Sequence, residues 1–210
     1  MKKFIFIMSV LFLLMLDCSS RGSYTNNTTK SNQLTGLFDK DSTVLSDTLT
    51  NTLTVVEKQE LSHYSQLFEH VYNYISQVSK RDSTEKTEIA KTIINAALEN
   101  NIDICFILAQ GTNETHMGTT GIGTTRKSIF GIYKTYKSYE SCINDYIRIL
   151  KKNYLTKGRT CHDIMKHYVT TNGSRYAEYT GYERKLKKKY HQIKHKTNIY
   201  QLQKKIESFK

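Results

Sequence analysis

The chain has 210 residues, enough for one domain with a hydrophobic core together with tails, and its formal net charge is +12. Such a basic chain first suggests a polyanionic partner, but it contains no zinc-finger spacing, RNA-recognition signature or glycine-rich phosphate loop, so nucleic acid is not the expected partner. The absence of proline favours a compact helical domain, because proline supplies the usual helix stops and kinks.

The first residues have the layout of an export signal. Two lysines precede a thirteen-residue apolar run, Phe4 to Leu16, which is too short to span a membrane as a helix. The run ends in "LMLDCSS", which resembles the lipobox of bacterial lipoproteins, although Asp17 stands where that motif has a small residue. We predict a signal peptide over residues 1–17 and a lipidated Cys18 that anchors the protein to a membrane of the cell envelope. A plain cleaved signal is the alternative.

Residues 18–54 are rich in Ser, Thr and Asn and poor in aromatic residues. Such a composition buries too little apolar surface to offset chain entropy, so we predict a disordered tether. A tether lets a lipid-anchored domain reach a target away from the membrane. The folded domain is then expected over residues 55–210.

Apolar residues at helical spacing begin at Leu61 and predict a helix that runs to Val78. Asp82 and Asp103 are placed to cap two further helices, and the second of these is expected to end at Gly118. The segment that follows, "GTTGIGTTRKSIFGIYKTYK", holds four of the ten glycines and predicts an irregular loop or a small hairpin.

The second half of the chain predicts three more helices. One begins at Ser138, and another begins at Thr160, where "TCHD" reads as a capping box. The last carries the basic run "ERKLKKKYHQIKHK", either as a solvated face or as a surface that holds the domain on anionic wall or lipid surfaces. The predicted fold class is mainly α, with about six helices.

The cysteines and histidines do not predict a metal site or a cofactor. If Cys18 is lipidated, Cys105, Cys142 and Cys161 remain, which allows at most one disulfide. Cys105 and Cys142 lie among apolar residues and are expected to pack in the core. The spacing of Cys161 and the nearby histidines matches no familiar zinc pattern, and no HExxH motif is present.

The stretch "AQGTNETHMGTTG" ends a predicted helix on a carboxylate, Glu114. That charge faces the negative end of the helix dipole, which costs roughly 0.3–1 kcal/mol. Gln110 lies four residues earlier on the same face. Phe130 and the tyrosine-rich segment 172–186 are candidates to surround Glu114, raise its pKa and keep it protonated as a general acid. The alternative is a solvated glutamate in a last helical turn.

Four ordered motifs carry a resemblance to a known family. They are "FILAQGTNETHMGTT", "SIFGI", "YKSYESCINDYIRIL" and "RYAEYTGYERKL". In this order they resemble the bacterial glucosaminidase domain, the lysozyme-like peptidoglycan-hydrolysing family of autolysins and of the flagellar rod wall hydrolase. The resemblance spans roughly residues 94–193.

The resemblance implies a lysozyme-like catalytic domain with a short irregular or hairpin insertion after the catalytic helix. It implies that Glu114 is the catalytic acid and that Tyr176 lies beside the reacting sugar. It also implies a set of residues that shape the substrate site: Gln110, Ser128, Phe130, Gly131 and Tyr182. The expected substrate is peptidoglycan, cut at a β-1,4 bond next to N-acetylglucosamine by a monomer without a metal or an organic cofactor.

The chain departs from the family pattern where a second carboxylate is usually supplied. Many members carry a longer β-rich insertion, whereas only "YKTY" separates Ile132 from the next motif. The remaining candidates are Glu178, Glu140 and Glu183, none of which has a motif behind it, and Glu178 is the candidate to test. A one-carboxylate mechanism is the hypothesis that follows. A muramidase, a lytic transglycosylase and a catalytically inactive wall-binding lipoprotein remain as alternatives.

Overall fold

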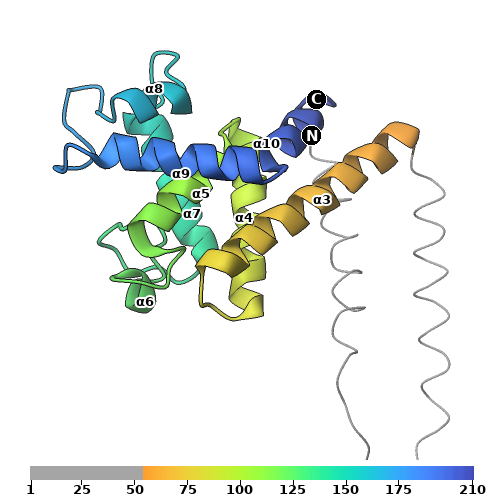
Figure 1. Ribbon diagram of the computed structural model, residues 1–210, viewed down its shortest axis with the longest axis horizontal. Coiled ribbons are helices and arrows are strands. Elements are labelled where there is room, and N and C mark those ends of the chain that lie inside the picture. The colour runs from red at the N-terminus through yellow and green to blue at the C-terminus, as the bar shows by residue number, and fades with distance from the viewer. Residues whose placement is uncertain (1–53) are drawn as a thin grey trace, which may run out of the picture. The chain divides into compact units, whose positions relative to one another are not determined.

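The structure is a computed structural model that describes residues 54–210 (Figure 1). The predicted signal peptide, the lipidation site Cys18 and all but the last residue of the predicted tether lie outside the described residues. The described part folds into eight helices: α3 (Val55–Val78), α4 (Ser83–Asn100), α5 (Ile104–Thr115), α6 (Gly123–Arg126), α7 (Tyr139–Asn153), α8 (Cys161–Lys166), α9 (Tyr182–Lys196) and α10 (Ile199–Glu207).

The mainly α, lysozyme-like fold class is confirmed, and details of three helices differ from the expectation. Helix α3 begins six residues before Leu61, and helix α5 ends at Thr115 and not at Gly118. The segment after α5 is irregular, which is one of the two expected alternatives, and it contains one short helix, α6. Helix α10 was not predicted, because Thr197 and Asn198 interrupt the helical chain without a glycine or proline to mark the break.

Side-chain caps start four of the helices where the sequence places them. Asp82 accepts the Glu85 N–H at the start of α4, and Asp103 accepts the Cys105 N–H at the start of α5. Ser138 and Thr160 form reciprocal capping boxes at α7 and α8. These contacts satisfy backbone donors that would otherwise lack partners, so the predicted helix starts are confirmed.

Helix α5 is the centre of the core, and ten of its twelve residues are buried. It contacts α4, α9 and α10, and α7 packs on α4 while α8 packs on α9. In Figure 1 the blue helix α9 crosses the green helix α5. Since a helix buried on nearly all sides has little freedom to shift, α5 holds whatever stands at its C-terminal end in a fixed place.

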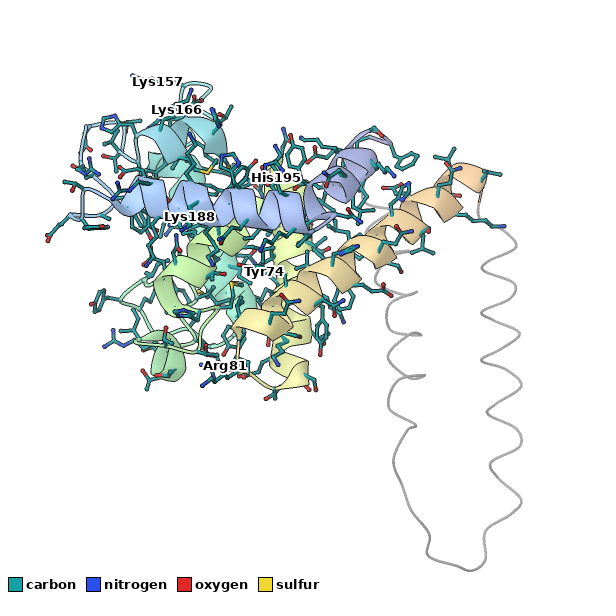
Figure 2. All side chains as sticks on the ribbon, viewed as in Figure 1. Tyr74, Arg81, Lys157, Lys166, Lys188 and His195 are labelled. Atoms are coloured by element: carbon teal, nitrogen blue, oxygen red, sulfur yellow. The ribbon has the colours of Figure 1, made fainter. Side chains whose placement is uncertain are left out.

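The segment that follows α5 is folded back and held there by Arg81, labelled in Figure 2. The Arg81 guanidinium donates to the Gly118 carbonyl at 2.6 Å and to the Gly123 carbonyl at 2.8 Å. The Thr115 hydroxyl donates to the Ile129 carbonyl at 2.6 Å. These bonds fix the path of residues 118–131 against the end of α5.

The described cysteines are free thiols, and Cys105 and Cys142 are buried in the core as expected, whereas Cys161 is partly buried. Burial raises the pKa of Cys142 to about 11 and that of Cys161 to about 12. Among residues 54–210, no helix is both long enough and apolar enough to cross a membrane.

Candidate active site

Glu114 stands in the last turn of α5, where the helix ends at His116 in the left-handed conformation. The His116 N–H bonds to the Gly111 and Thr112 carbonyls and closes the helix. The negative end of the helix dipole therefore lies beside the Glu114 carboxylate. A carboxylate at this end of a helix is stabilised by other groups or is protonated.

Two tyrosines hold one oxygen of Glu114. The Tyr176 hydroxyl donates to Oε1 at 3.1 Å, and the Tyr182 hydroxyl makes a short hydrogen bond to the same oxygen. Burial of the side chain raises the pKa of Glu114, and the hydrogen bonds from Tyr182 and Tyr176 and the positive charge of Lys185 oppose that rise. Burial is the largest of these effects, so the site favours the protonated acid more than water does.

Gly131 faces the other oxygen of Glu114. A Cβ at this position would lie 2.9 Å from Oε2, and the Gly131 backbone has φ +69°, which side chains rarely adopt. Ser128 holds the turn that presents Gly131, because its buried hydroxyl donates to the Ile132 carbonyl at 2.7 Å. Gly131 thus leaves a space beside Oε2 of Glu114 that the Cβ of any other residue at this position would fill.

The two tyrosines belong to a larger aromatic cluster. Tyr176 stacks flat on Tyr168, with ring centroids 4.2 Å apart and planes within 8°. Tyr182 lies tilted against Tyr176 at 5.2 Å, and Tyr154 meets Tyr168 edge-on at 4.9 Å. These ring contacts leave Tyr176 little freedom to turn its hydroxyl away from Glu114.

Gln110 and Phe130 support the tyrosines from inside the core. The Oε1 atom of Gln110 accepts the hydroxyls of Tyr146 at 2.6 Å and Tyr168 at 2.9 Å, and the Phe130 ring stacks on Tyr146 at 3.7 Å. Gln110 and Ser128 are 0 % exposed and Phe130 is 1 % exposed. In this structure these three side chains contact other groups of the site, and the substrate-binding role expected for them stays a prediction.

The three candidates for a second carboxylate lie in different settings. Glu178 is exposed, and Glu140 is exposed in the first turn of α7. Glu183 forms a two-oxygen ion pair with Arg175, at 2.7 and 2.9 Å, and so holds the loop before α9. Within residues 54–210, none of these carboxylates shares a tyrosine hydroxyl with Glu114.

Sequence reasoning missed three members of the aromatic cluster, Tyr146, Tyr154 and Tyr168. Tyr168 lies in the loop "KHYVTTN" between α8 and α9, where no motif marks it. The available signal was composition, since the chain has 15 tyrosines and no tryptophan. Composition shows that tyrosines are numerous but cannot show that three separate segments bring them together.

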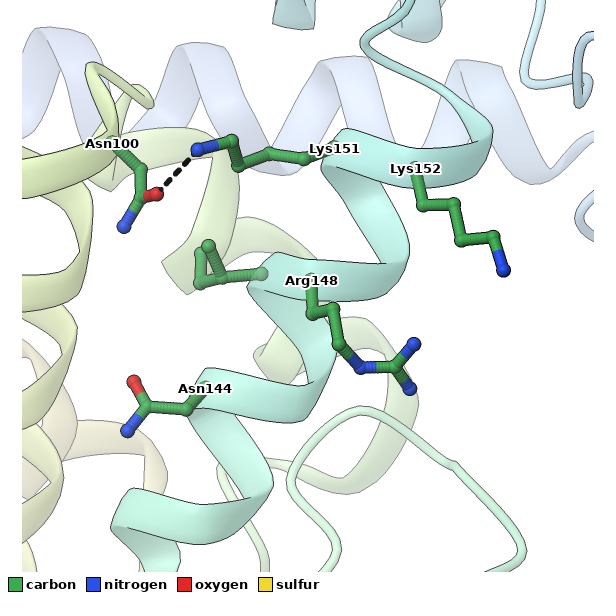
Figure 3. A pocket seen from close by; sticks show the side chains of 6 residues that line it. Asn100, Asn144, Arg148, Lys151 and Lys152 are labelled. Atoms are coloured by element: carbon green, nitrogen blue, oxygen red, sulfur yellow. Dashed lines mark hydrogen bonds between the residues drawn. The ribbon is translucent and has the colours of Figure 1, made fainter.

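A pocket elsewhere in the described chain has no carboxylate in its lining. An open pocket of about 500 Å³ between α4 and α7 is lined by Asn100, Asn144, Ile147, Arg148, Lys151 and Lys152. Figure 3 shows Lys151 bonded to Asn100 there, and the lining includes no carboxylate. Among residues 54–210, no group of three or more His, Cys, Asp or Glu side chains is arranged to hold a metal ion.

A helical domain that presents a carboxylic acid of raised pKa among tyrosines has the features of a lysozyme-like glycoside hydrolase. The model of the glucosaminidase family, described as mannosyl-glycoprotein endo-beta-N-acetylglucosaminidase, matches residues 90–195. The chain therefore belongs to this family, which confirms the resemblance found in the sequence. Neither the curated proteins nor the solved structures include a match to the chain.

Proposed function

We propose that this protein cleaves β-1,4 bonds next to N-acetylglucosamine in peptidoglycan, with Glu114 as its general acid. The family supports a peptidoglycan-degrading glycoside hydrolase in general. The observation that carries the finer proposal is the setting of Glu114. Its Oε1 is occupied by two tyrosine hydroxyls, its Oε2 faces Gly131, and burial raises its pKa.

The two carboxylate oxygens of Glu114 have different surroundings, which suits proton donation from one of them. Because Tyr176 and Tyr182 both donate to Oε1, the acidic proton belongs on Oε2. Gly131 leaves space beside that atom for the oxygen of a glycosidic bond. Tyr176, which touches the acid and stacks on Tyr168, is the group best placed to lie beside the reacting sugar.

A single carboxylate is sufficient if the substrate supplies the nucleophile. The 2-acetamido oxygen of the sugar attacks the anomeric carbon, the bond to the leaving oxygen breaks, and Glu114 gives its proton to that oxygen. Water then attacks the same carbon, the bond to the acetamido oxygen breaks, and Glu114 takes back a proton. Glu114 thus ends the cycle as it began.

The same one-carboxylate site supports a second reaction. If the 6-hydroxyl of a muramyl residue attacks in place of water, the product is a 1,6-anhydro sugar, as in a lytic transglycosylase. A muramidase on this scaffold would cut the other β-1,4 bond of the repeat. A wall-binding lipoprotein without activity is the remaining alternative. The exposed position of Glu178 favours it, because Glu178 is the candidate for a second catalytic carboxylate.

The test is digestion of purified peptidoglycan by the full chain as wild type, Glu114→Gln and Glu178→Gln, with mass spectrometry of the fragments before and after borohydride reduction. We expect fragments with reducing N-acetylglucosamine ends from the wild type and from Glu178→Gln, and none from Glu114→Gln. Reducing muramyl ends or 1,6-anhydro ends would select a muramidase or a transglycosylase. Loss of cleavage in folded Glu178→Gln would contradict the one-carboxylate mechanism.

This function also fits the expected location. A peptidoglycan hydrolase acts in the cell envelope, outside the cytoplasm. Residues 1–17 as a signal peptide, a lipid anchor at Cys18 and a tether over residues 18–54 would bring the catalytic domain, residues 55–210, to the wall. Metabolic labelling with a radioactive fatty acid, compared between wild type and Cys18→Ala, tests the anchor.

A further inference from the structure

Helix α9 carries an excess of positive charge that the proposed chemistry does not use. It holds seven lysines and arginines and one glutamate, Glu183, which is already paired with Arg175. In the part of the chain that the structure describes, none of the seven cations forms an ion pair with a carboxylate. This helix therefore presents a strongly cationic surface; Figure 2 labels Lys188 and His195 on it.

Three of these lysines form a row along α9 that begins beside Glu114. Tyr182, Lys185, Lys189 and Lys196 follow one another at intervals of three, four and seven residues, so they lie along one side of α9. Tyr182 donates to Glu114, and the positive charge of Lys185 acts on the same carboxylate. At a rise of 1.5 Å per residue the row extends about 21 Å from Tyr182 to Lys196.

The surface lacks what insertion into a lipid bilayer would need. The apolar residues of α9, Leu186, Tyr190 and Ile193, are buried against the core. The exposed large hydrophobic residues of the described part are Val55, Val56, Tyr133 and Tyr179, and none of them is on α9. A cationic row without apolar anchors favours a hydrated polyanion over the interior of a membrane.

We propose that the row Lys185–Lys189–Lys196 binds the carboxylates of the stem peptides that peptidoglycan carries along its glycan strand. This inference rests on the proposed function, because a strand that places one sugar at Glu114 brings its attached peptides alongside the helix that starts there. The substrate class is then glycan that bears acidic peptides, in preference to uncharged oligosaccharides. Lysines suit this task, since a flexible point charge adapts to carboxylates at varying positions.

The test separates charge from sugar recognition by using one wall preparation in two forms. One form is native peptidoglycan, and in the other the stem carboxyl groups are converted to amides with a carbodiimide and methylamine. Binding of the full chain is measured by cosedimentation in the Glu114→Gln background, so that cleavage does not interfere. The test variant is Lys189→Gln with Lys196→Gln. The matched control is Lys80→Gln with Lys205→Gln, which removes the same charge from exposed positions that are not on α9.

We expect the test variant to bind native peptidoglycan about fivefold more weakly, because it loses two ion pairs of modest strength. Its binding to the amidated form should change by no more than about twofold. Added salt should weaken the binding of the native form more than that of the amidated form. Equal losses on both forms, or no loss on the native form, would overturn the proposal. Cleavage by the chain with Glu114 intact is scored separately, so a failure of the proposed function is distinguishable from a failure of this inference.

Discussion

At the scale of single residues, the site is defined by what surrounds one carboxylate. Glu114 is held by Tyr176 and Tyr182 on Oε1 and is faced by Gly131 on Oε2. Each neighbour acts differently, because the tyrosines stabilise the charged form and burial stabilises the neutral form. Changing one neighbour at a time therefore gives effects of predictable sign.

Replacing Tyr182 with Phe removes a hydrogen bond that lowers the pKa of Glu114, so that pKa rises further in the variant. A general acid works in its protonated form and loses activity as the pH rises through its pKa. The alkaline limb of the kcat/KM profile for peptidoglycan should therefore move to higher pH. Tyr179→Phe, at an exposed ring, is the control and should leave the limb in place. A limb that moved to lower pH in Tyr182→Phe would exclude Glu114 as the acid.

Gly131→Ala tests the space beside Oε2. The new Cβ would lie 2.9 Å from that oxygen in a backbone with φ +69°, so we expect loss of cleavage and a destabilisation of about 1–3 kcal/mol. Gly158→Ala is the matched control, because Gly158 has φ +76° and nothing lies within 4 Å of its added Cβ. It should show a similar loss in thermal unfolding with activity retained. Equal activities in the two variants would mean that Gly131 matters only for the backbone.

The sequence predicted the site residues that belong to a motif. It did not predict the residues that reach the site only through packing. Tyr176 and Tyr182 contact Glu114 in the structure, although they lie 62 and 68 positions after it along the chain. Tyr168 and Tyr146 could not be predicted, since their contacts join loops and helices whose relative positions depend on the whole core. Gln110 and Phe130 were recognised as important, but their burial was not foreseen.

At the scale of elements, polar side chains decide where helices begin. The sequence predicts the capping residues because a cap bonds to backbone groups only two or three residues away; they are Asp82, Asp103, Ser138 and Thr160. The role of Gln203 of α10 could not be predicted in this way. Its Oε1 accepts the Ile104 N–H at 2.9 Å and its Nε2 donates to the Ile102 carbonyl at 2.9 Å, about a hundred residues earlier in the chain.

Gln203→Ala should therefore destabilise the domain by about 2 kcal/mol or more, because it leaves a buried donor and a buried acceptor at the start of α5 without their partner. Gln201→Ala, two positions away on the exposed side of α10, should change stability by no more than about 0.5 kcal/mol. Urea unfolding followed by circular dichroism measures both. Equal midpoints for the two variants would contradict the assigned role of Gln203.

At the scale of the whole molecule, the family match is shorter than the folded core. The match covers residues 90–195, whereas buried residues come also from α3, namely Leu67, Val71 and Ile75, and from α10, namely Ile199, Leu202 and Ile206. The Tyr74 hydroxyl of α3 bonds to the Thr112 hydroxyl of α5 at 2.9 Å. Helices outside the match thus cover the helix that carries Glu114.

A fragment limited to residues 90–195 should lose cooperative thermal unfolding, since each large apolar side chain that it lacks contributes about 1.5–3 kcal/mol when buried, and a domain has only about 5–15 kcal/mol in total. Scanning calorimetry of the full chain and of the fragment makes the comparison. A fragment with a sharp transition near that of the full chain would show that α3 and α10 are accessory.

The stacked tyrosines beside Glu114 have an optical consequence. The chain contains no tryptophan, so tyrosine dominates its ultraviolet emission, and closely stacked rings couple in the near-ultraviolet circular dichroism. A carboxylate that accepts a hydrogen bond from a tyrosine quenches that tyrosine's fluorescence. The tyrosine fluorescence of the unmodified protein should therefore change when Glu114 ionises and when a glycan binds. Both events can then be followed by intrinsic fluorescence, without an attached dye.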